Sequence, residues 1–127
     1  MNIVRNVALI KERIANACAR AHRGTDEVKL LAVTKYAPEE AVQELLNAGI
    51  QCLGESRVQQ AVKRIHKFGP EVEWHLIGSL QTNKVKYCRN FSLIHSLDRW
   101  RLAEELDFRA RQWGKRQDVL VQVNIGG

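Results

Sequence analysis

Apolar residues follow two alternating patterns along the chain. Short apolar runs bounded by turn residues are typical of buried strands in a parallel sheet. These runs predict five strands, at residues 30–34, 50–54, 74–78, 93–96 and 118–125. Between the runs, apolar residues recur at spacings of three and four, which predicts amphipathic helices. The helices are expected at residues 3–22, 38–48, 58–68 and 98–113, with a further helix opening at 79–84.

Strands that alternate with helices at a spacing of roughly 20 residues predict an α/β fold of parallel βα units. The pattern fits either an open doubly wound sheet or a (β/α)₈ barrel. A complete barrel has eight strands and typically about 250 residues, whereas this chain has 127. We therefore expect a single partial domain over residues 1–127. Its N-terminal helix falls within 1–24, and residues 30–127 form the first five strands of a TIM barrel that is incomplete at the C-terminus.

The composition is that of a globular protein, with 45% apolar and 27% charged residues. No segment approaches the roughly 20 apolar residues of a membrane span, so we expect no membrane partner. The three cysteines, Cys18, Cys52 and Cys88, are far apart and lack the spacing of a zinc site. We expect free thiols in a reducing cytoplasm, without a disulfide or a metal site.

The net charge of +6 is concentrated in residues 57–90, which carry seven lysines and arginines against two acids. Such a segment is able to attract nucleic acid or another polyanion. It contains no RNP-like aromatic platform, zinc finger or convincing helix-turn-helix pattern. The sequence therefore favours a solvated basic face, and nucleic acid is not an expected partner.

Lys35 lies where the first predicted strand gives way to a helix that opens at Pro38. In βα proteins, ligands and catalytic groups collect at the carboxyl ends of the strands. Apolar neighbours disfavour the charged form of an amine in such a place. An uncharged lysine condenses with an aldehyde, as in sites that bind pyridoxal 5′-phosphate (PLP). The alternative is an ordinary surface lysine just past a strand.

The other predicted strands also carry polar residues that a parallel sheet would bring toward one rim. These are Ser56 after the second strand, His75 within the third, His95 in the fourth and Asn124 near the end of the fifth. Taken singly, such a histidine is more often structural, and a serine or asparagine at a strand end is more often a cap. Together they would surround a lysine nucleophile with hydrogen-bonding groups, as a Schiff-base site requires.

Five motifs of this chain resemble those of one family, in that family's order and spacing. The motifs are Ala-Val-Thr-Lys (32–35), Gly-Glu-Ser-Arg-Val-Gln-Gln (54–60), Trp-His-Leu-Ile-Gly-Ser-Leu-Gln-Thr-Asn-Lys (74–84), Ile-His-Ser-Leu-Asp (94–98) and Val-Gln-Val-Asn-Ile (121–125). The family is that of the YggS/PROSC-type pyridoxal phosphate homeostasis proteins, which are related to the N-terminal barrel of alanine racemase. The resemblance covers almost the whole chain from residue 30 onward, and it matches the N-terminal portion of the family only.

The resemblance implies PLP as the cofactor and assigns roles to individual residues. Lys35 matches the lysine that forms the Schiff base, and His75 matches a histidine near the cofactor ring, with Asn124 beside it on a strand end. Ser56 stands where the family usually has asparagine. A hydroxyl replaces one hydrogen bond of an amide but not its paired donor and acceptor. The contact at Ser56 therefore departs from the family's pattern.

Three functional readings follow from the sequence. The resemblance favours an intracellular protein of PLP homeostasis that holds or delivers the cofactor without turnover, with apo PLP enzymes as partners. The alternatives are a PLP-dependent amino-acid racemase and a basic interaction module without a cofactor. A racemase needs a second proton-transfer group, usually a tyrosine, and neither Tyr36 nor Tyr87 has an obvious claim to that role. The family's phosphate-holding residues lie beyond the matched portion. We therefore expect this chain to lack bound PLP or to self-associate through an open sheet edge.

Overall fold

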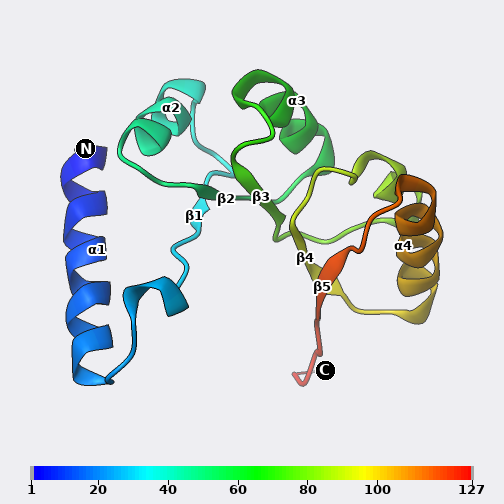
Figure 1. The fold of residues 1–127 in the computed structure, drawn as a ribbon. Helices are drawn as coiled ribbons and strands as arrows, with labels where there is room; N and C mark the ends of the chain where they lie inside the picture. Colours follow the sequence, from blue (N-terminus) through cyan, green and yellow to red (C-terminus); the bar gives the residue numbers. More distant parts are fainter. Residues whose placement is uncertain (1, 127) are drawn as a thin grey trace.

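Five parallel strands form the centre of the structure, and the helices lie in an arc along their outer side (Figure 1). The computed structural model describes residues 2–126. The strands are β1 (Ala32–Val33), β2 (Cys52–Glu55), β3 (Glu73–Leu76), β4 (Leu93–Leu97) and β5 (Asp118–Val121). The helices are α1 (Ile3–Arg20), α2 (Glu39–Asn47), α3 (Val58–Phe68) and α4 (Trp100–Trp113), with short 3₁₀ segments η1 (Thr25–Glu27) and η2 (Thr82–Tyr87).

The strand order distinguishes the two folds that the sequence pattern left open. The strands lie side by side in the order β1-β2-β3-β4-β5, and every neighbouring pair is parallel. A doubly wound sheet reverses its order at a switch point, whereas a barrel keeps chain order throughout. The predicted α/β fold is therefore confirmed in its barrel form, as the first five strands of a TIM-type sheet.

The strand register divides the side chains between two faces of the sheet. Leu53 of β2 is opposite Trp74 of β3, and Leu76 is opposite Ile94 of β4. These four side chains are almost completely buried against the helices, which supply the other half of the core. The alternate residues, among them His75, lie on the opposite, inner face. The hydrophobic core is thus on the helix side of the sheet, and Glu73 and His75 lie on the inner side.

Several predicted boundaries agree closely with the structure. Helix α3 spans Val58–Phe68 as predicted, and Gly69 ends it with a φ of +96°. Gly49, with a φ of +91°, follows the C-cap of α2. Both conformations are ones that glycine adopts without strain, so the glycines mark the helix ends reliably.

Two strands are shorter than predicted. β1 forms only two pairs with β2, Ala32 with Leu53 and Val33 with Gly54, so residues 30–31 are not part of it. β5 was predicted to reach Ile125, but it ends at Val121, which pairs with the last residue of β4. Beyond that pair β4 offers no further ladder partner. Asn124 therefore lies outside the strand that was predicted to carry it.

The starts of three helices also differ from the prediction. Pro38 is the N-cap of α2 rather than its first residue. The N-cap of α4 is Arg99 rather than Asp98, whose carboxylate instead accepts a hydrogen bond of 2.7 Å from the Arg99 guanidinium. The segment predicted as a helix at 79–84 is the 3₁₀ segment η2.

No helix in the described part of the chain is both long and apolar enough to span a bilayer.

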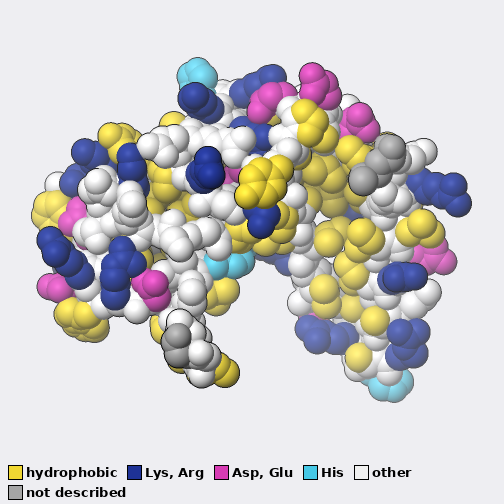
Figure 2. All heavy atoms as spheres, turned by 180° about the vertical axis from the view of Figure 1, so that it is seen from behind, with side chains coloured by type: hydrophobic (Ala, Val, Ile, Leu, Met, Phe, Trp, Pro, Cys, Tyr) yellow, Lys and Arg dark blue, Asp and Glu magenta, His cyan; other side chains and the backbone are white. Residues whose placement is uncertain are grey.

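Apolar side chains remain exposed on the inner side and at both edges of the sheet. Figure 2 shows apolar side chains, in yellow, on both sides of the open space between α1 and the C-terminal end of the chain. At the β1 edge Val33 is 53% exposed, and at the β5 edge Val121 is 70% exposed. Strand edges of this kind present unpaired backbone groups as well as apolar side chains.

Candidate functional site

Lys35 lies in a tight turn that connects β1 to α2. The turn is closed by a hydrogen bond of 3.0 Å from the Ala37 N–H to the Thr34 carbonyl oxygen. The Thr34 N–H in turn donates to the Gly54 carbonyl oxygen of β2, also at 3.0 Å. The lysine side chain is exposed, whereas the sequence predicted apolar neighbours around its amine. Its Nζ lies 5.6 Å from the centre of the Tyr36 ring. The backbone beneath Lys35 is thus fixed while its amine stands in solvent.

A buried ion pair on the helix side of the sheet holds both ends of this turn. Arg64 of α3 donates to the Thr34 carbonyl oxygen at 2.6 Å and makes a short hydrogen bond to the Ala37 carbonyl oxygen. The same guanidinium pairs with the fully buried Glu55 of β2 at 2.6 Å. The Thr34 hydroxyl also donates to Glu55, at 2.7 Å. A single buried side chain, Arg64, therefore ties the Lys35 turn to β2 and α3.

Ser56 lies beside Lys35, as the sequence predicted. Both residues line one hollow of about 580 Å³, which we call the Lys35 hollow and which also includes Tyr36, Arg57, Gln60 and Lys63. Ser56 is itself positioned by a close approach of Gly78, which follows β3. A Cβ atom on Gly78 would lie within 2.9 Å of both Cα and C of Ser56. Only glycine leaves room for the Ser56 backbone at this point.

The Lys35 hollow carries more cations than acids, since Glu39 is the acid in its lining and is paired with Arg64 and Lys67. Among residues 2–126, Lys35, Arg57 and Lys63 form no ion pair with a carboxylate, and all three side chains are exposed. Unpaired cations around a concave surface raise the local concentration of anions. The basic segment noted in the sequence therefore contributes to a specific hollow as well as to a solvated face.

His75 lies on the inner face and belongs to a separate polar network. Its Nε2 is 2.7 Å from a Glu73 carboxylate oxygen, and its Nδ1 is 3.0 Å from Nε2 of His95. The Glu73 carboxylate also accepts two hydrogen bonds from Lys29 Nζ, at 2.7 and 2.8 Å. His75 and His95 line a different hollow from that of Lys35. The structure thus does not bring His75 and Lys35 into one hollow.

Burial and mutual contacts shift the pKa of several groups in this network. Burial alone would raise the pKa of Glu73, but the hydrogen bonds from Lys29 and His75 outweigh it and lower that pKa. The hydrogen bond to Glu73 raises the pKa of Lys29. Burial and, second, the charge of His75 lower the pKa of His95. Burial, reinforced by the charge of Glu73, raises the pKa of Cys52 to about 12. The network therefore favours a neutral His95 and an ionised Lys29–Glu73 pair.

Asn124 does not join the other predicted residues. It lies three positions beyond the end of β5, it is exposed, and its Oδ1 accepts a hydrogen bond of 3.2 Å from the Gly126 N–H. It lines neither the Lys35 hollow nor the hollow of His75. Of the four residues proposed from the sequence, the described structure groups Lys35 with Ser56 and leaves His75 and Asn124 apart.

The residues that sequence reasoning missed are those that position the site. Glu55 lies in a strand whose four residues are all buried, and Arg64 lies between Ala61 and Ile65 on the buried face of α3. Charged residues are almost never fully buried unless they are paired. A glutamate in an apolar strand and an arginine on the apolar stripe of the following helix were therefore an available signal for this pair.

Comparison with known proteins gives relatives over the whole chain. The family described as "Alanine racemase, N-terminal domain" matches residues 5–127. The pyridoxal phosphate homeostasis protein of Aquifex aeolicus (strain VF5) is 46% identical over 129 residues, which cover 100% of this chain and 57% of that protein. The protein of the same name from Escherichia coli (strain K12) is 36% identical, over 98% of this chain and 55% of that protein. The chain thus spans about half the length of the curated relatives it matches.

A solved structure shows the same arrangement. PipY of Synechococcus elongatus PCC7942, determined with PLP bound, is 38% identical and superposes with a TM-score of 0.75. The match covers 91% of this chain and 55% of PipY. The structure of PipY without PLP also gives a TM-score of 0.75.

Proposed function

This chain belongs to the family of the alanine racemase N-terminal domain, and on that premise we propose that it binds PLP as a Schiff base on Lys35. We propose this in place of the expectation that the chain lacks PLP, because the Lys35 hollow carries cations of its own although the family's phosphate-holding residues lie beyond the matched portion. When bound, PLP supplies an aldehyde that condenses with an amine. The observation that carries the proposal is the position of Lys35, on a turn fixed at both ends and beside a positive hollow. PipY, solved with PLP bound, and the relatives named for PLP homeostasis support it.

The residues of the Lys35 hollow fit an anionic aldehyde. Lys63 and Arg57 offer unpaired positive charge to a phosphate, and the half-buried Ser56 offers a hydroxyl that both donates and accepts. Arg64 also lines the hollow, but its guanidinium is occupied by Glu39, Glu55 and two carbonyl oxygens, so it would hold the backbone of the Lys35 turn rather than bind the cofactor. His75 and Asn124 remain candidate contacts, proposed from the family resemblance.

We further propose a role in intracellular PLP homeostasis without turnover. Under this proposal the protein holds the cofactor in the cytoplasm and delivers it to apo PLP enzymes. The buried, free state of all three cysteines is consistent with a reducing compartment. A racemase would need a proton-transfer group on the opposite side of the cofactor. Tyr36 is 85% exposed beside Lys35, and Tyr87 is 50% exposed on η2, so neither is held in position for that task. Racemisation of alanine at a rate that depends on Tyr36 would overturn the non-catalytic role.

Reductive trapping tests the site. The chain is incubated with PLP, reduced with borohydride, digested and mapped by mass spectrometry. We expect the pyridoxyl group predominantly on Lys35, and we expect Lys35→Ala to abolish the visible absorbance of the Schiff base. Lys86→Ala is the matched control, because it removes an exposed amine on η2, outside the Lys35 hollow, and leaves the residues of that hollow in place. Equal labelling of many lysines, or unchanged labelling of the Lys35→Ala variant, would contradict the proposal.

The open edges of the sheet lead to a second, independent expectation. We propose that this chain self-associates through β1 or β5, whose outer sides carry unpaired backbone groups and exposed apolar residues such as Val33 and Val121. Sedimentation velocity at increasing concentration measures this directly. A monomer over the whole concentration range would exclude it.

A further inference from the structure

Three side chains with different ligand atoms meet on the inner face of the sheet, near the amino ends of β2 and β3. They are Cys52, Glu73 and His75, whose ligand atoms all lie within 4.8 Å of one another. Cys52 Sγ is 3.5 Å from a Glu73 carboxylate oxygen, and that oxygen is 2.7 Å from His75 Nε2. The residues are distant in sequence and match no metal-binding spacing. The parallel register of β2 and β3 brings them together.

We propose that Cys52, Glu73 and His75 form a binding site for a divalent zinc ion, with water as a fourth ligand. Thiolate, carboxylate and imidazole are the three ligand types that zinc prefers, and three protein ligands with one open position is a common zinc arrangement. Binding of the ion would release the proton of the Cys52 thiol to solvent, and the resulting thiolate and the Glu73 carboxylate would then balance the two charges of the ion. This proposal does not depend on Lys35 or on PLP.

Two of the three distances require little rearrangement, and the third, between Cys52 Sγ and the His75 ring nitrogen, lies within 4.8 Å and must shorten by at most roughly 1.5 Å. Tetrahedral zinc with bonds of about 2.0–2.3 Å places its ligand atoms about 3.3–3.6 Å apart. The observed 3.5 Å between Cys52 Sγ and the Glu73 oxygen already meets this value. The 2.7 Å between Glu73 and His75 must lengthen by roughly half an ångström. Glu73 is able to supply that change once Lys29 releases its carboxylate, because its side chain is 32% exposed.

His95 holds the ring of His75 in the orientation that a metal ligand needs. A zinc-bound histidine usually donates its other ring N–H to a fixed acceptor, which sets its tautomer. In the structure, Nδ1 of His75 lies 3.0 Å from Nε2 of His95. With Nε2 of His75 on the metal, Nδ1 would carry the proton and donate to His95. The hydrogen-bond partner that would orient a zinc-bound His75 is therefore already in place.

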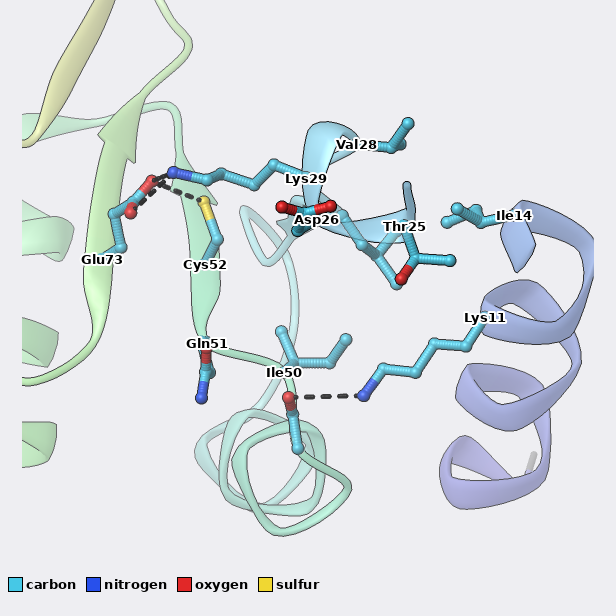
Figure 3. Close-up of a pocket in the computed structure, with 12 residues that line it drawn as sticks. Lys11, Ile14, Thr25, Asp26, Val28, Lys29, Ile50, Gln51, Cys52 and Glu73 are labelled. Atoms are coloured by element: carbon cyan, nitrogen blue, oxygen red, sulfur yellow. Dashed lines mark hydrogen bonds and ion pairs between the residues drawn. The ribbon is translucent and has the colours of Figure 1, made fainter. Parts of the chain in front are cut away.

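The Lys29 ammonium supplies the positive charge that a zinc ion would bring to Glu73. It must leave the carboxylate before the ion is able to bind. Figure 3 shows the Lys29 Nζ directed at the Glu73 carboxylate, next to Cys52 Sγ. The Lys29 side chain is 59% exposed, so it is free to swing into solvent when a cation arrives. Cys52 and Glu73 also border a hollow of about 500 Å³ between α1 and the sheet, which gives an entry path. Zinc and the Lys29 ammonium are thus expected to compete for Glu73.

Titration with Co²⁺ and Zn²⁺ in the absence of PLP tests the site. Co²⁺ reports its ligands directly, because thiolate coordination adds a charge-transfer band and tetrahedral geometry intensifies its visible bands. We expect Cys52→Ser to abolish the charge-transfer band and His75→Gln to weaken binding about tenfold or more, with His95→Gln about tenfold weaker. Cys88→Ser and His66→Gln are matched controls, since Cys88 is buried elsewhere and His66 is exposed on α3. Neither should change the titration.

Lys29→Gln separates the proposed site from chance binding. If the ammonium competes with the metal, removing it should strengthen Zn²⁺ binding about tenfold or more, whereas loss of a merely structural lysine would leave the affinity unchanged. Circular dichroism and urea unfolding confirm that each variant is folded. A Co²⁺ spectrum without a thiolate band, or binding that survives both Cys52→Ser and His75→Gln, would overturn the proposal. So would an affinity that Lys29→Gln leaves unaltered.

Discussion

Replacing Arg64 by methionine tests whether one buried side chain holds the Lys35 turn. The change removes the partner of the fully buried Glu55 and the hydrogen bonds to the carbonyl oxygens of Thr34 and Ala37. Breaking a buried ion pair by removing one partner costs about 3–5 kcal/mol, because the other charge stays buried. Each buried carbonyl that loses its donor adds about 1 kcal/mol. We expect a total loss of about 5–7 kcal/mol, a large share of the roughly 5–15 kcal/mol of a typical domain.

Urea unfolding followed by tryptophan fluorescence measures the free energy of unfolding of each variant. Arg64→Lys keeps the charge but loses the planar fork, so it should cost about half as much and remain folded. The double variant Glu55→Gln/Arg64→Met removes both charges and should be more stable than Arg64→Met alone, by about 2 kcal/mol. Lys63→Met, one residue away and exposed, is the matched control. A loss below about 1 kcal/mol for Arg64→Met would refute the reasoning.

Three shorter predictions follow from other contacts. Because burial lowers the pKa of His95, the unfolded chain binds its proton more readily, so the free energy of unfolding should fall as pH drops below about 6.5, and less so in His95→Gln. Burial raises the pKa of Cys88 to about 12, and its alkylation at pH 8 should be more than about a hundredfold slower in buffer than in urea, as read by mass spectrometry. Gly78→Ala should displace Ser56 and lower the free energy of unfolding by about 1–3 kcal/mol, whereas Gly126→Ala, whose Cβ would meet only Asn124 at 3.9 Å, should have no effect.

The sequence predicted the order of the elements because periodicity reports which residues face a core. Helix α3 was predicted at its observed bounds, since its apolar spacing and Gly69 both act locally. Lys35 and Ser56 were predicted together for a related reason. Each follows a parallel strand, and neighbouring parallel strands end at one rim. Local patterns and the geometry of the βα unit were sufficient for these features.

The parts that the sequence did not predict depend on partners distant in the chain. The apolar alternation at residues 119–125 predicts a long fifth strand, but β5 ends where β4 ends, at the pair of Leu97 and Val121. Asn124 was misplaced for that reason. Likewise, the convergence of Cys52, Glu73 and His75 requires the register of β2 on β3, which no spacing of cysteine and histidine encodes.

In the motif Gly-Glu-Ser at the end of β2, the buried charge of Glu55 stands directly before Ser56 of the Lys35 hollow. Successive residues of a strand point to opposite faces. Gly54 lies on the inner face, where a Cβ atom would meet Leu31 at 3.3 Å, while Glu55 points to the helices and pairs with Arg64. Ser56 then lines the Lys35 hollow.

This alternation allows the positioning of Lys35 to be separated from its contacts. Glu55→Gln acts on the Lys35 turn through the backbone, so it should lower the free energy of unfolding and the PLP labelling of Lys35 together. Ser56→Ala removes only a half-buried hydroxyl from the hollow, so it should lower the labelling and leave stability within about 0.5 kcal/mol. Measuring the free energy of unfolding and the PLP labelling for both variants therefore separates the positioning of Lys35 from its contacts. If Glu55→Gln destabilised the fold but left labelling intact, the turn would not need its clamp in order to present Lys35.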